Sequence, residues 1–148
     1  MVKEKPRAAG VVPLRRTGDG WRVLVLRAYR SWDFPKGLRE PGEDALATAR
    51  REAREEADLN DLTFPWGDAS CDTAPYAGGK VATYFLARTE RQDVVLPVSP
   101  VLGRPEHHEG RWVRFEEAAR LLPPRLQPVL AWARALVEGD DQAGPRST

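Results

Sequence analysis

One helical segment, residues 43–57, lies among segments of strand composition and constrains the fold of this 148-residue chain more than any other part of it. The segment is rich in Ala, Leu, Arg and Glu and contains neither Gly nor Pro, a composition that favours a helix. Small apolar residues recur at helical spacing and form one stripe, which consists of Leu46, Ala49, Ala53 and Ala57. This stripe predicts a helix that packs closely against a sheet.

The expected strands are segments rich in Val, Leu and aromatic residues between turn signals. Residues 8–15 and 21–28 flank a Gly-containing turn and predict an antiparallel pair, with Val23 and Val25 on one face of the second strand and Leu24 and Leu26 on the other. Residues 31–37 predict a loop, and Gly78 and Gly79 predict a hairpin turn. The remaining expected strands are 80–88, 93–98 and 111–115, and the remaining expected helices are 116–122 and 125–139.

Strands that surround one central helix and precede a terminal helix imply a mixed sheet packed between helices. The expected fold class is therefore α/β (α+β), with a mixed β-sheet sandwiched between helices in an α/β/α arrangement. The chain length suits a single domain, which we assign to residues 1–138. The polar residues 139–148 are expected to form a flexible C-terminal tail.

The charge of the chain is balanced, with 23 basic and 22 acidic residues and a formal net charge of +1. Such a balance provides no general field for a long nucleic acid or an anionic membrane, so the expected partner is a small molecule held by local charge. Cys71 is the single cysteine, and no apolar run approaches a signal segment or a membrane span. These features predict a cytoplasmic protein, in which Cys71 is a half-buried residue and not a nucleophile.

Three carboxylates of the central helix, Glu52, Glu55 and Glu56, have the spacing that places them on one face. That face is expected to point away from the core, because the small stripe occupies the opposite side. Like charges at this spacing destabilise a helix, and a bound Mg²⁺ or Mn²⁺ would compensate for the repulsion. The alternative is a solvated, salt-bridged surface with pairs such as Arg51 with Glu55.

A longer pattern decides between these interpretations. Gly37 is followed after five residues by Glu43, which is followed after seven by Arg51-Glu52-Ala53-Arg54-Glu55-Glu56 and then Leu59. This resembles the Nudix box, G-x5-E-x7-R-E-U-x-E-E-x-G-U, in which U is a bulky aliphatic residue. The chain departs from the box at Ala53, which is small, and at Asp58, where glycine normally ends the helix in a left-handed turn.

The resemblance implies the Nudix fold and hydrolysis of phosphoric anhydrides with Mg²⁺ or Mn²⁺. It implies that Glu43 pairs with Arg51 and braces the preceding loop against the helix. Glu55, Glu56 and Arg51 are then catalytic residues. The residues implied as metal ligands are Gly37, through its carbonyl, and Glu52, Glu55, Glu56 and Glu106.

The loop at residues 105–113, PEHHEGRWV, is similar to a family loop in which a glutamate lies six residues before a tryptophan. Glu106 matches that position and is our candidate for a further metal ligand or for the general base. Glu109 is the competing candidate, since spacing alone does not choose between them. His107 and His108 either assist or are solvated loop residues.

The segment WDFPKG, residues 32–37, resembles the diadenosine tetraphosphate hydrolases, also called asymmetrical bis(5'-nucleosyl)-tetraphosphatases, and bacterial diadenosine hexaphosphate enzymes. GKVATYFLAR, residues 79–88, is similar to the tetraphosphatases as well. The predicted substrate-binding residues are Arg27, Lys36, Lys80 and Tyr84 for the phosphates and Tyr76 for adenine. Tyr84 could instead be a core aromatic residue and Lys80 a sheet-edge charge, while Trp32 and Trp66 compete with Tyr76.

The sequence therefore predicts a Mg²⁺-dependent Nudix pyrophosphohydrolase that cleaves diadenosine tetraphosphate to ATP and AMP, as a monomer or a homodimer. One alternative keeps the chemistry and changes the substrate to 5'-triphosphorylated RNA or to inositol or sugar pyrophosphates. Another is a Nudix-fold module that senses a nucleotide without turnover. Intact glutamates throughout the box speak against that module.

Overall fold

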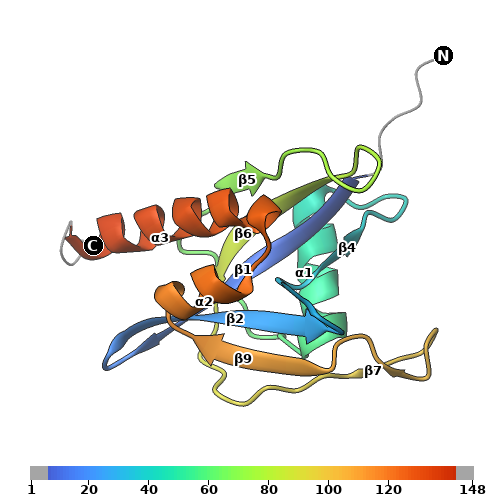
Figure 1. The fold of residues 1–148 in the computed structure, drawn as a ribbon, viewed down its shortest axis with the longest axis horizontal. Coiled ribbons are helices and arrows are strands. Elements are labelled where there is room, and N and C mark those ends of the chain that lie inside the picture. The colour runs from blue at the N-terminus through green and yellow to red at the C-terminus, as the bar shows by residue number, and fades with distance from the viewer. Residues whose placement is uncertain (1–6, 143–148) are drawn as a thin grey trace.

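The computed structural model describes residues 7–142, which form a sheet between two helical layers (Figure 1). The seven-stranded sheet follows the order β3-β2-β1-β6-β5, with β4 also paired to β1 and β9 paired to β2. Its strands are β1 Arg7–Thr17, β2 Gly20–Ala28, β3 Ser31–Asp33, β4 Lys36–Leu38, β5 Ser70–Asp72, β6 Val81–Arg88 and β9 Glu109–Val113. Two short strands, β7 Val98–Ser99 and β8 Arg104–Pro105, form a separate hairpin.

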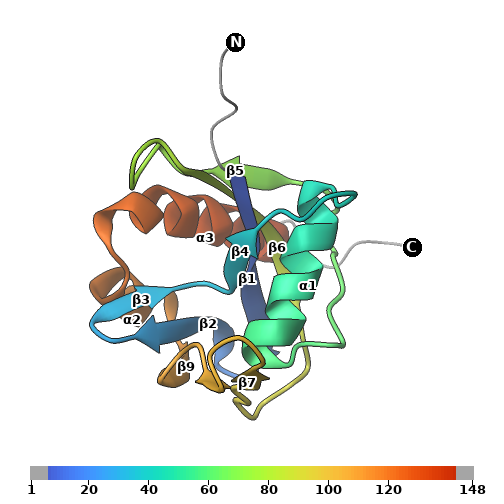
Figure 2. The same ribbon diagram turned by 90° about the vertical axis from the view of Figure 1, so that its right-hand side faces the viewer.

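The helices cover both faces of the sheet. They are α1 Ala45–Ala57, α2 Phe115–Leu121, the 3-10 helix η1 Pro124–Leu126 and α3 Gln127–Gln142. Figure 2 shows α1 on one side of β1 and β6, with α3 on the other side. The mixed sheet between helices that the sequence predicted is thus confirmed, because β1 runs parallel to β6 and antiparallel to β2 and β4.

Alternating residues of the central strands supply two separate cores. Val23 and Val25 of β2 are buried on the side of α2 and α3, whereas Leu24 and Leu26 are buried on the side of α1. This alternation confirms the predicted faces and follows from the two-residue period of a strand. On the second side lie the buried alanines of the predicted helix stripe, Ala49, Ala53 and Ala57.

The two ends of β1 pair with different strands, and this pairing brings β4 beside α1. Leu14–Thr17 pair with β2, whereas Ala8–Gly10 pair with β4. The short strand β4 thereby lies beside α1 and brings Gly37 to that helix. Residues 31–37, predicted to be a loop, therefore contain β3 and the start of β4.

Other boundaries also differ from the predictions. The strand expected at 93–98 is absent except for Val98, where β7 begins. Helix α3 extends to Gln142, so residues 139–142, predicted to belong to a flexible tail, are helical. The rest of that predicted tail, residues 143–148, lies outside the described residues. Within residues 7–142, no helix combines the length and the apolar character that crossing a membrane requires.

Both ends of α1 are fixed by identifiable contacts. Asp44 caps the N-terminus, since its Oδ1 accepts the Ala47 N–H at 2.8 Å. Asp58 ends the helix in the left-handed conformation at φ 56°, and the Leu59 N–H donates to the Ala53 carbonyl at 3.2 Å. The Asp58 carboxylate pairs with Arg91 at 2.8 Å. The aspartate that replaces the usual glycine thus keeps the glycine-type turn and gains an ion pair.

Candidate active site

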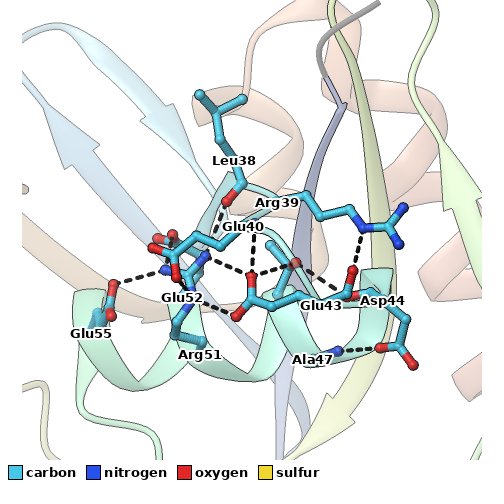
Figure 3. A network of polar contacts seen from close by, with 10 residues as sticks. Leu38, Arg39, Glu40, Glu43, Asp44, Ala47, Arg51, Glu52 and Glu55 are labelled. Atoms are coloured by element: carbon cyan, nitrogen blue, oxygen red, sulfur yellow. Dashed lines mark hydrogen bonds and ion pairs between the residues drawn. The ribbon is translucent and has the colours of Figure 1, made fainter. Parts of the chain in front are cut away.

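Arg51 of α1 is the centre of a polar network that joins the helix to the loop before it (Figure 3). Its Nε and Nη2 donate to both oxygens of Glu43 at 2.7 and 3.0 Å, which confirms the predicted pair. Nη2 also donates to the Leu38 carbonyl at 3.0 Å, at the end of β4. The hydrogen bond from Arg51 lowers the pKa of Glu43 to about 2, so this carboxylate stays charged throughout the physiological range. Arg51 therefore ties β4, the loop and α1 together.

Glu52 is held between Arg51 and the backbone of β4. Arg51 Nη1 donates to Glu52 Oε1 at 2.7 Å, and the Glu52 side chain is only 12% exposed. A Cβ atom added to Gly37 would lie 2.2 Å from Glu52 Cδ, which is far inside van der Waals contact. The position therefore requires glycine because the Glu52 carboxylate lies directly against the chain there.

Glu56 is the most deeply buried carboxylate of the group, with 5% of its surface exposed. Its Oε2 accepts the Lys36 backbone N–H at 3.2 Å, and its Oε1 lies 3.5 Å from His107 Nδ1. Burial lowers the pKa of His107, so the imidazole is neutral near pH 7 and does not stabilise the ionised form of Glu56. The pKa of Glu56 is raised well above its usual range by burial, then by a hydrogen bond to Glu52 and by the nearby charge of Glu106.

The predicted orientation of the acidic face is wrong in part. Glu55 is exposed, at 54% of its side chain, but Glu52 and Glu56 are enclosed by β4 and by the loop that carries His107. Helical spacing correctly placed the three carboxylates on one side of α1. It contained no information about the segments that later pack against that side.

Glu106 and Glu109, which spacing could not distinguish, lie in opposite electrostatic environments. Glu106 is exposed as a residue, but partial burial of its carboxylate and the charge of Glu52 raise its pKa. Hydrogen bonds from Arg111 and Arg27 lower the pKa of Glu109, and Arg27 Nε lies 3.1 Å from Glu109 Oε1. Glu106 thus belongs to the group around Glu52 and Glu56, whereas Glu109 is occupied by two guanidinium groups.

His108, the second loop histidine, faces away from this group. Its Nδ1 accepts the Tyr29 backbone N–H at 3.1 Å, and its own backbone N–H donates to the Arg27 carbonyl at 2.7 Å. His108 therefore anchors the loop to the end of β2. Arg27, predicted to bind phosphate, is occupied by Glu109 and by the Tyr29 carbonyl, to which its Nη1 donates at 2.7 Å.

A second polar cluster begins at Lys36 and converges on Asp33. The Lys36 ammonium lies 3.4 Å from Asp33 Oδ2, Arg125 Nη2 donates to the same oxygen at 2.8 Å, and the Tyr84 hydroxyl donates to Oδ1 at 3.0 Å. Burial on its own lowers the pKa of Lys36, but Asp33, Tyr76 and Glu56 outweigh it and raise the pKa. Sequence reasoning missed Asp33 and Arg125. Asp33 stands within the WDFPKG motif, whereas no sequence signal marks Arg125.

Tyr84 is fully buried in the core. Burial, followed by Asp33, raises the pKa of its hydroxyl well above the usual value. Because this hydroxyl donates to Asp33, the placement argues against the predicted direct contact between Tyr84 and a substrate. Tyr84 instead helps to hold the Asp33 carboxylate in place through this hydrogen bond.

The remaining candidates divide between the site and the core. One ring face of Tyr76 is covered by the Arg125 guanidinium, 4.7 Å from the ring centre. Trp32 is buried, and Trp66 packs edge-on against Trp21, so both serve the core on the side of α3. Lys80 closes the predicted hairpin turn, where its N–H donates to the Tyr76 carbonyl at 2.7 Å, and it forms no ion pair within residues 7–142.

Cys71 is half-buried, as predicted, and burial raises the pKa of its thiol, which disfavours the reactive thiolate.

Across the described part of the chain, no three His, Cys, Asp or Glu side chains are arranged to hold a metal ion. Arg51 contributes to the absence of such a cluster, since its Nη1 donates hydrogen bonds to both Glu52 and Glu55.

Comparison with known proteins finds a family and several named relatives that this chain resembles. The model of the NUDIX domain family matches residues 4–133. The asymmetrical bis(5'-nucleosyl)-tetraphosphatase of Sus scrofa is 33% identical over 127 residues, which cover 78% of this chain and 83% of the relative. The tetraphosphatase of the same name from Caenorhabditis elegans is 31% identical over 121 residues, with the same coverage.

Solved structures agree with this relationship. The C. elegans Ap4A hydrolase binary complex matches with a TM-score of 0.75 and 28% identity over 89% of this chain and 98% of that chain. The NUDIX domain of Shewanella oneidensis NrtR, solved with ADP ribose, matches with a TM-score of 0.71 over 92% of this chain and 90% of that domain. At 13% identity, the second likeness shows the fold alone. Together these matches confirm the resemblance and the fold that the motif predicted.

Proposed function

The chain belongs to the NUDIX family of pyrophosphate-bond hydrolases, and from this premise we propose that it is a divalent-metal-dependent enzyme that cleaves dinucleoside polyphosphates such as diadenosine tetraphosphate. The proposed products of that substrate are ATP and AMP. The names of the relatives support this substrate class. The chemistry of the site described above supports the metal requirement.

The observation that carries the proposal is the crowding of Glu56 with Glu52 and Glu106. An ionised carboxylate that is almost completely buried beside two others destabilises the metal-free protein. Hard oxygen donors of this kind suit Mg²⁺ or Mn²⁺ and not a soft metal. The donor set therefore fits a divalent cation, with Glu52, Glu55, Glu56, Glu106 and the Gly37 carbonyl as the proposed ligands. When bound, such a cation would neutralise phosphate oxygens and acidify a water molecule.

The environment of Glu106 supports its role as general base. A carboxylate with an ordinary pKa is a weak base at neutral pH, and partial burial together with the charge of Glu52 raises the pKa of Glu106. Glu109 is less suitable, because Arg111 and Arg27 stabilise its ionised form. We therefore assign to Glu106 the removal of the proton from the attacking water.

Three basic residues are candidates for contacts with the substrate phosphates, and they differ in whether a carboxylate of the chain already holds the side chain. Lys36 lies next to Glu56 through its own backbone N–H and keeps its ammonium charged. Lys80, at the hairpin turn, forms no ion pair among the described residues, so we propose that its ammonium is the second phosphate contact. Arg27 is held by Glu109, so we propose for it an indirect part in shaping the loop that carries Glu106.

Turnover of a substrate panel tests the proposal directly. The purified protein would be incubated with dinucleoside polyphosphates, capped and 5'-triphosphorylated RNA, inositol pyrophosphates and ADP-ribose, each with Mg²⁺ and with EDTA. Chromatography would resolve the products. We expect ATP and AMP from diadenosine tetraphosphate with Mg²⁺ and no product with EDTA. No turnover of any substrate, or equal rates with EDTA, would contradict the proposal.

A single substitution separates chemistry from folding. Glu56→Gln keeps the volume of the side chain and the acceptor for the Lys36 N–H, so we expect the fold to persist and kcat to fall by roughly 10²- to 10³-fold. Glu138→Gln is the matched control, because Glu138 pairs with Arg134 on the exposed surface of α3. Full activity of Glu56→Gln would refute the assignment of Glu56.

A further inference from the structure

Asp33 contacts three donors, two of which come from distant parts of the chain. Lys36 lies three residues away, Tyr84 belongs to β6, and Arg125 belongs to η1, 92 residues further along the chain. Only 13% of the Asp33 side chain is exposed, so its interactions are formed largely without competing water. Asp33 therefore fixes the guanidinium of Arg125 in one orientation near the Lys36 ammonium.

Two donors in this cluster are buried and have no partner. Arg125 Nε and the Tyr76 hydroxyl are enclosed and form no hydrogen bond in the described structure. Buried polar groups are normally satisfied, because an unpaired donor loses its hydration without compensation. The two groups are neighbours, since the Arg125 guanidinium lies over the Tyr76 ring at 4.7 Å. Because both atoms are enclosed, an acceptor from outside the chain would reach them only with a local movement of the Arg125 and Tyr76 side chains.

The charges of the cluster define the chemistry of that acceptor. Lys36 and Arg125 contribute two positive charges and Asp33 one negative charge, so the cluster favours an anion. Lys36 connects it to the carboxylate group, because its backbone N–H bonds to Glu56 while its ammonium contacts Asp33. A guanidinium suits a phosphate well, since its donors are fixed in one plane.

We propose that Arg125, positioned by Asp33, is a substrate-binding residue that contacts a phosphate of the polyphosphate chain on the Lys36 side of the carboxylate group. Arg125 Nε and the Tyr76 hydroxyl are the donors to that phosphate, and Asp33 acts through Arg125 as a positioning residue. The assignment rests on the proposed function, because it names a contact for the same class of substrate.

Arg134 of α3 offers an internal comparison. It also pairs with carboxylates, Glu116 and Glu138, both at 2.7 Å, and it also lies over an aromatic ring, that of Phe115. Its side chain is 41% exposed and no atom of it is a buried donor without a partner. Arg134 thus represents an arginine with a purely structural role, and Arg134→Ala is the matched control for Arg125→Ala.

Calorimetric titration with inorganic tripolyphosphate in EDTA tests the contact without turnover and without a metal. Wild type, Arg125→Ala, Arg125→Lys and Arg134→Ala would be compared, with Tm recorded for each. Loss of one charge-assisted hydrogen bond should raise the Kd of Arg125→Ala for tripolyphosphate by about 10- to 100-fold. Arg125→Lys should lie between wild type and Arg125→Ala, since lysine keeps the charge but not the planar donors. Arg134→Ala should bind as the wild type does.

Steady-state kinetics provides the second measurement. Arg125→Ala should raise KM for diadenosine tetraphosphate about 10- to 100-fold with little change in kcat, because the contact is proposed to bind the substrate and not to take part in the reaction. A wild-type Kd in Arg125→Ala, no binding of tripolyphosphate by the wild type, or equal losses in Arg125→Ala and Arg134→Ala would each overturn the assignment. If Arg125→Ala does not fold, the folded Arg125→Lys variant decides by the same comparison.

The two proposals fail in different ways. If the wild type binds tripolyphosphate through Arg125 but hydrolyses no dinucleoside polyphosphate, the proposed substrate is wrong and the anion contact stands. If the wild type hydrolyses diadenosine tetraphosphate and Arg125→Ala retains its KM, the proposed function stands and the contact is wrong.

Discussion

Gly37→Ala should displace the carboxylate of Glu52, a proposed metal ligand, without changing the chemical identity of that group. The new Cβ would lie 2.2 Å from Glu52 Cδ and 2.3 and 2.5 Å from its two oxygens. Ordinary contact between carbon atoms begins at roughly 3.5 Å. The Glu52 carboxylate, or the β4 backbone, must therefore move by about 1 Å.

The magnitude of the effect follows from that displacement. Misplacing a catalytic group by about 1 Å can reduce the rate by roughly 10²-fold, so we expect kcat/KM for diadenosine tetraphosphate to fall by about that factor. Overpacking of a tight site should also lower the free energy of unfolding by about 1–3 kcal/mol. Initial rates with Mg²⁺ and urea denaturation would measure the two effects.

Two further variants show whether the steric argument is correct. Gly18→Ala is the control, because Gly18 lies in the β1–β2 turn and an added Cβ would meet no atom within 4 Å. Glu52→Asp shortens the clashing side chain, so Gly37→Ala should cost less stability in the Glu52→Asp background than in the wild type. The reasoning would be refuted by wild-type kcat/KM and unchanged stability in Gly37→Ala.

Three other predictions concern stability. Gly139→Ala, at an open position within α3, should raise the free energy of unfolding by about 0.5–1 kcal/mol in urea titrations, and no gain would show that this turn is frayed. Asp58→Gly should melt a few degrees above Asp58→Ala, because alanine disfavours the left-handed conformation and both variants lose the Arg91 pair; an equal Tm would contradict this reading of the helix end. The Glu43 pKa is lowered to about 2 by Arg51, so the stabilising pair is complete above the unfolded pKa near 4.5 and is lost as the pH falls from there toward 2. The difference in Tm between wild type and Glu43→Gln should therefore be constant at neutral pH and shrink below pH 4.5, whereas a constant difference at all pH values would exclude this linkage.

Local spacing was sufficient to place the three carboxylates of the motif on one side of α1. The i, i+3 and i+4 relations of Glu52, Glu55 and Glu56 depend only on helix geometry, so they could be read before any tertiary structure was known. The pair between Glu43 and Arg51 could be expected from the motif and is present at 2.7 Å. The catalytic and metal-binding roles of these residues remain predictions for the experiments above.

Predictions failed where long-range packing decides. The face with the three carboxylates was expected to point away from the core, but β4 and the loop of His107 enclose Glu56. Tyr84 was expected to contact substrate, but its place in β6 directs its hydroxyl to Asp33 inside the core. Periodicity reports which residues share a face of one element, and it does not report what covers that face.

The sequence by itself therefore determined the family, the central helix, the strand faces and the carboxylate motif, because each is encoded in residue types at fixed short spacing. Only the tertiary structure decided the electrostatic environment of the individual side chains and the contacts between residues that lie far apart in the sequence. It raised the pKa of Glu106 and lowered that of Glu109 by placing Glu106 near Glu52 and Glu109 between Arg27 and Arg111. It also brought Arg125 to Asp33 across 92 residues of chain. Such contacts depend on the free energy of packing the whole domain, and no short stretch of sequence contains them.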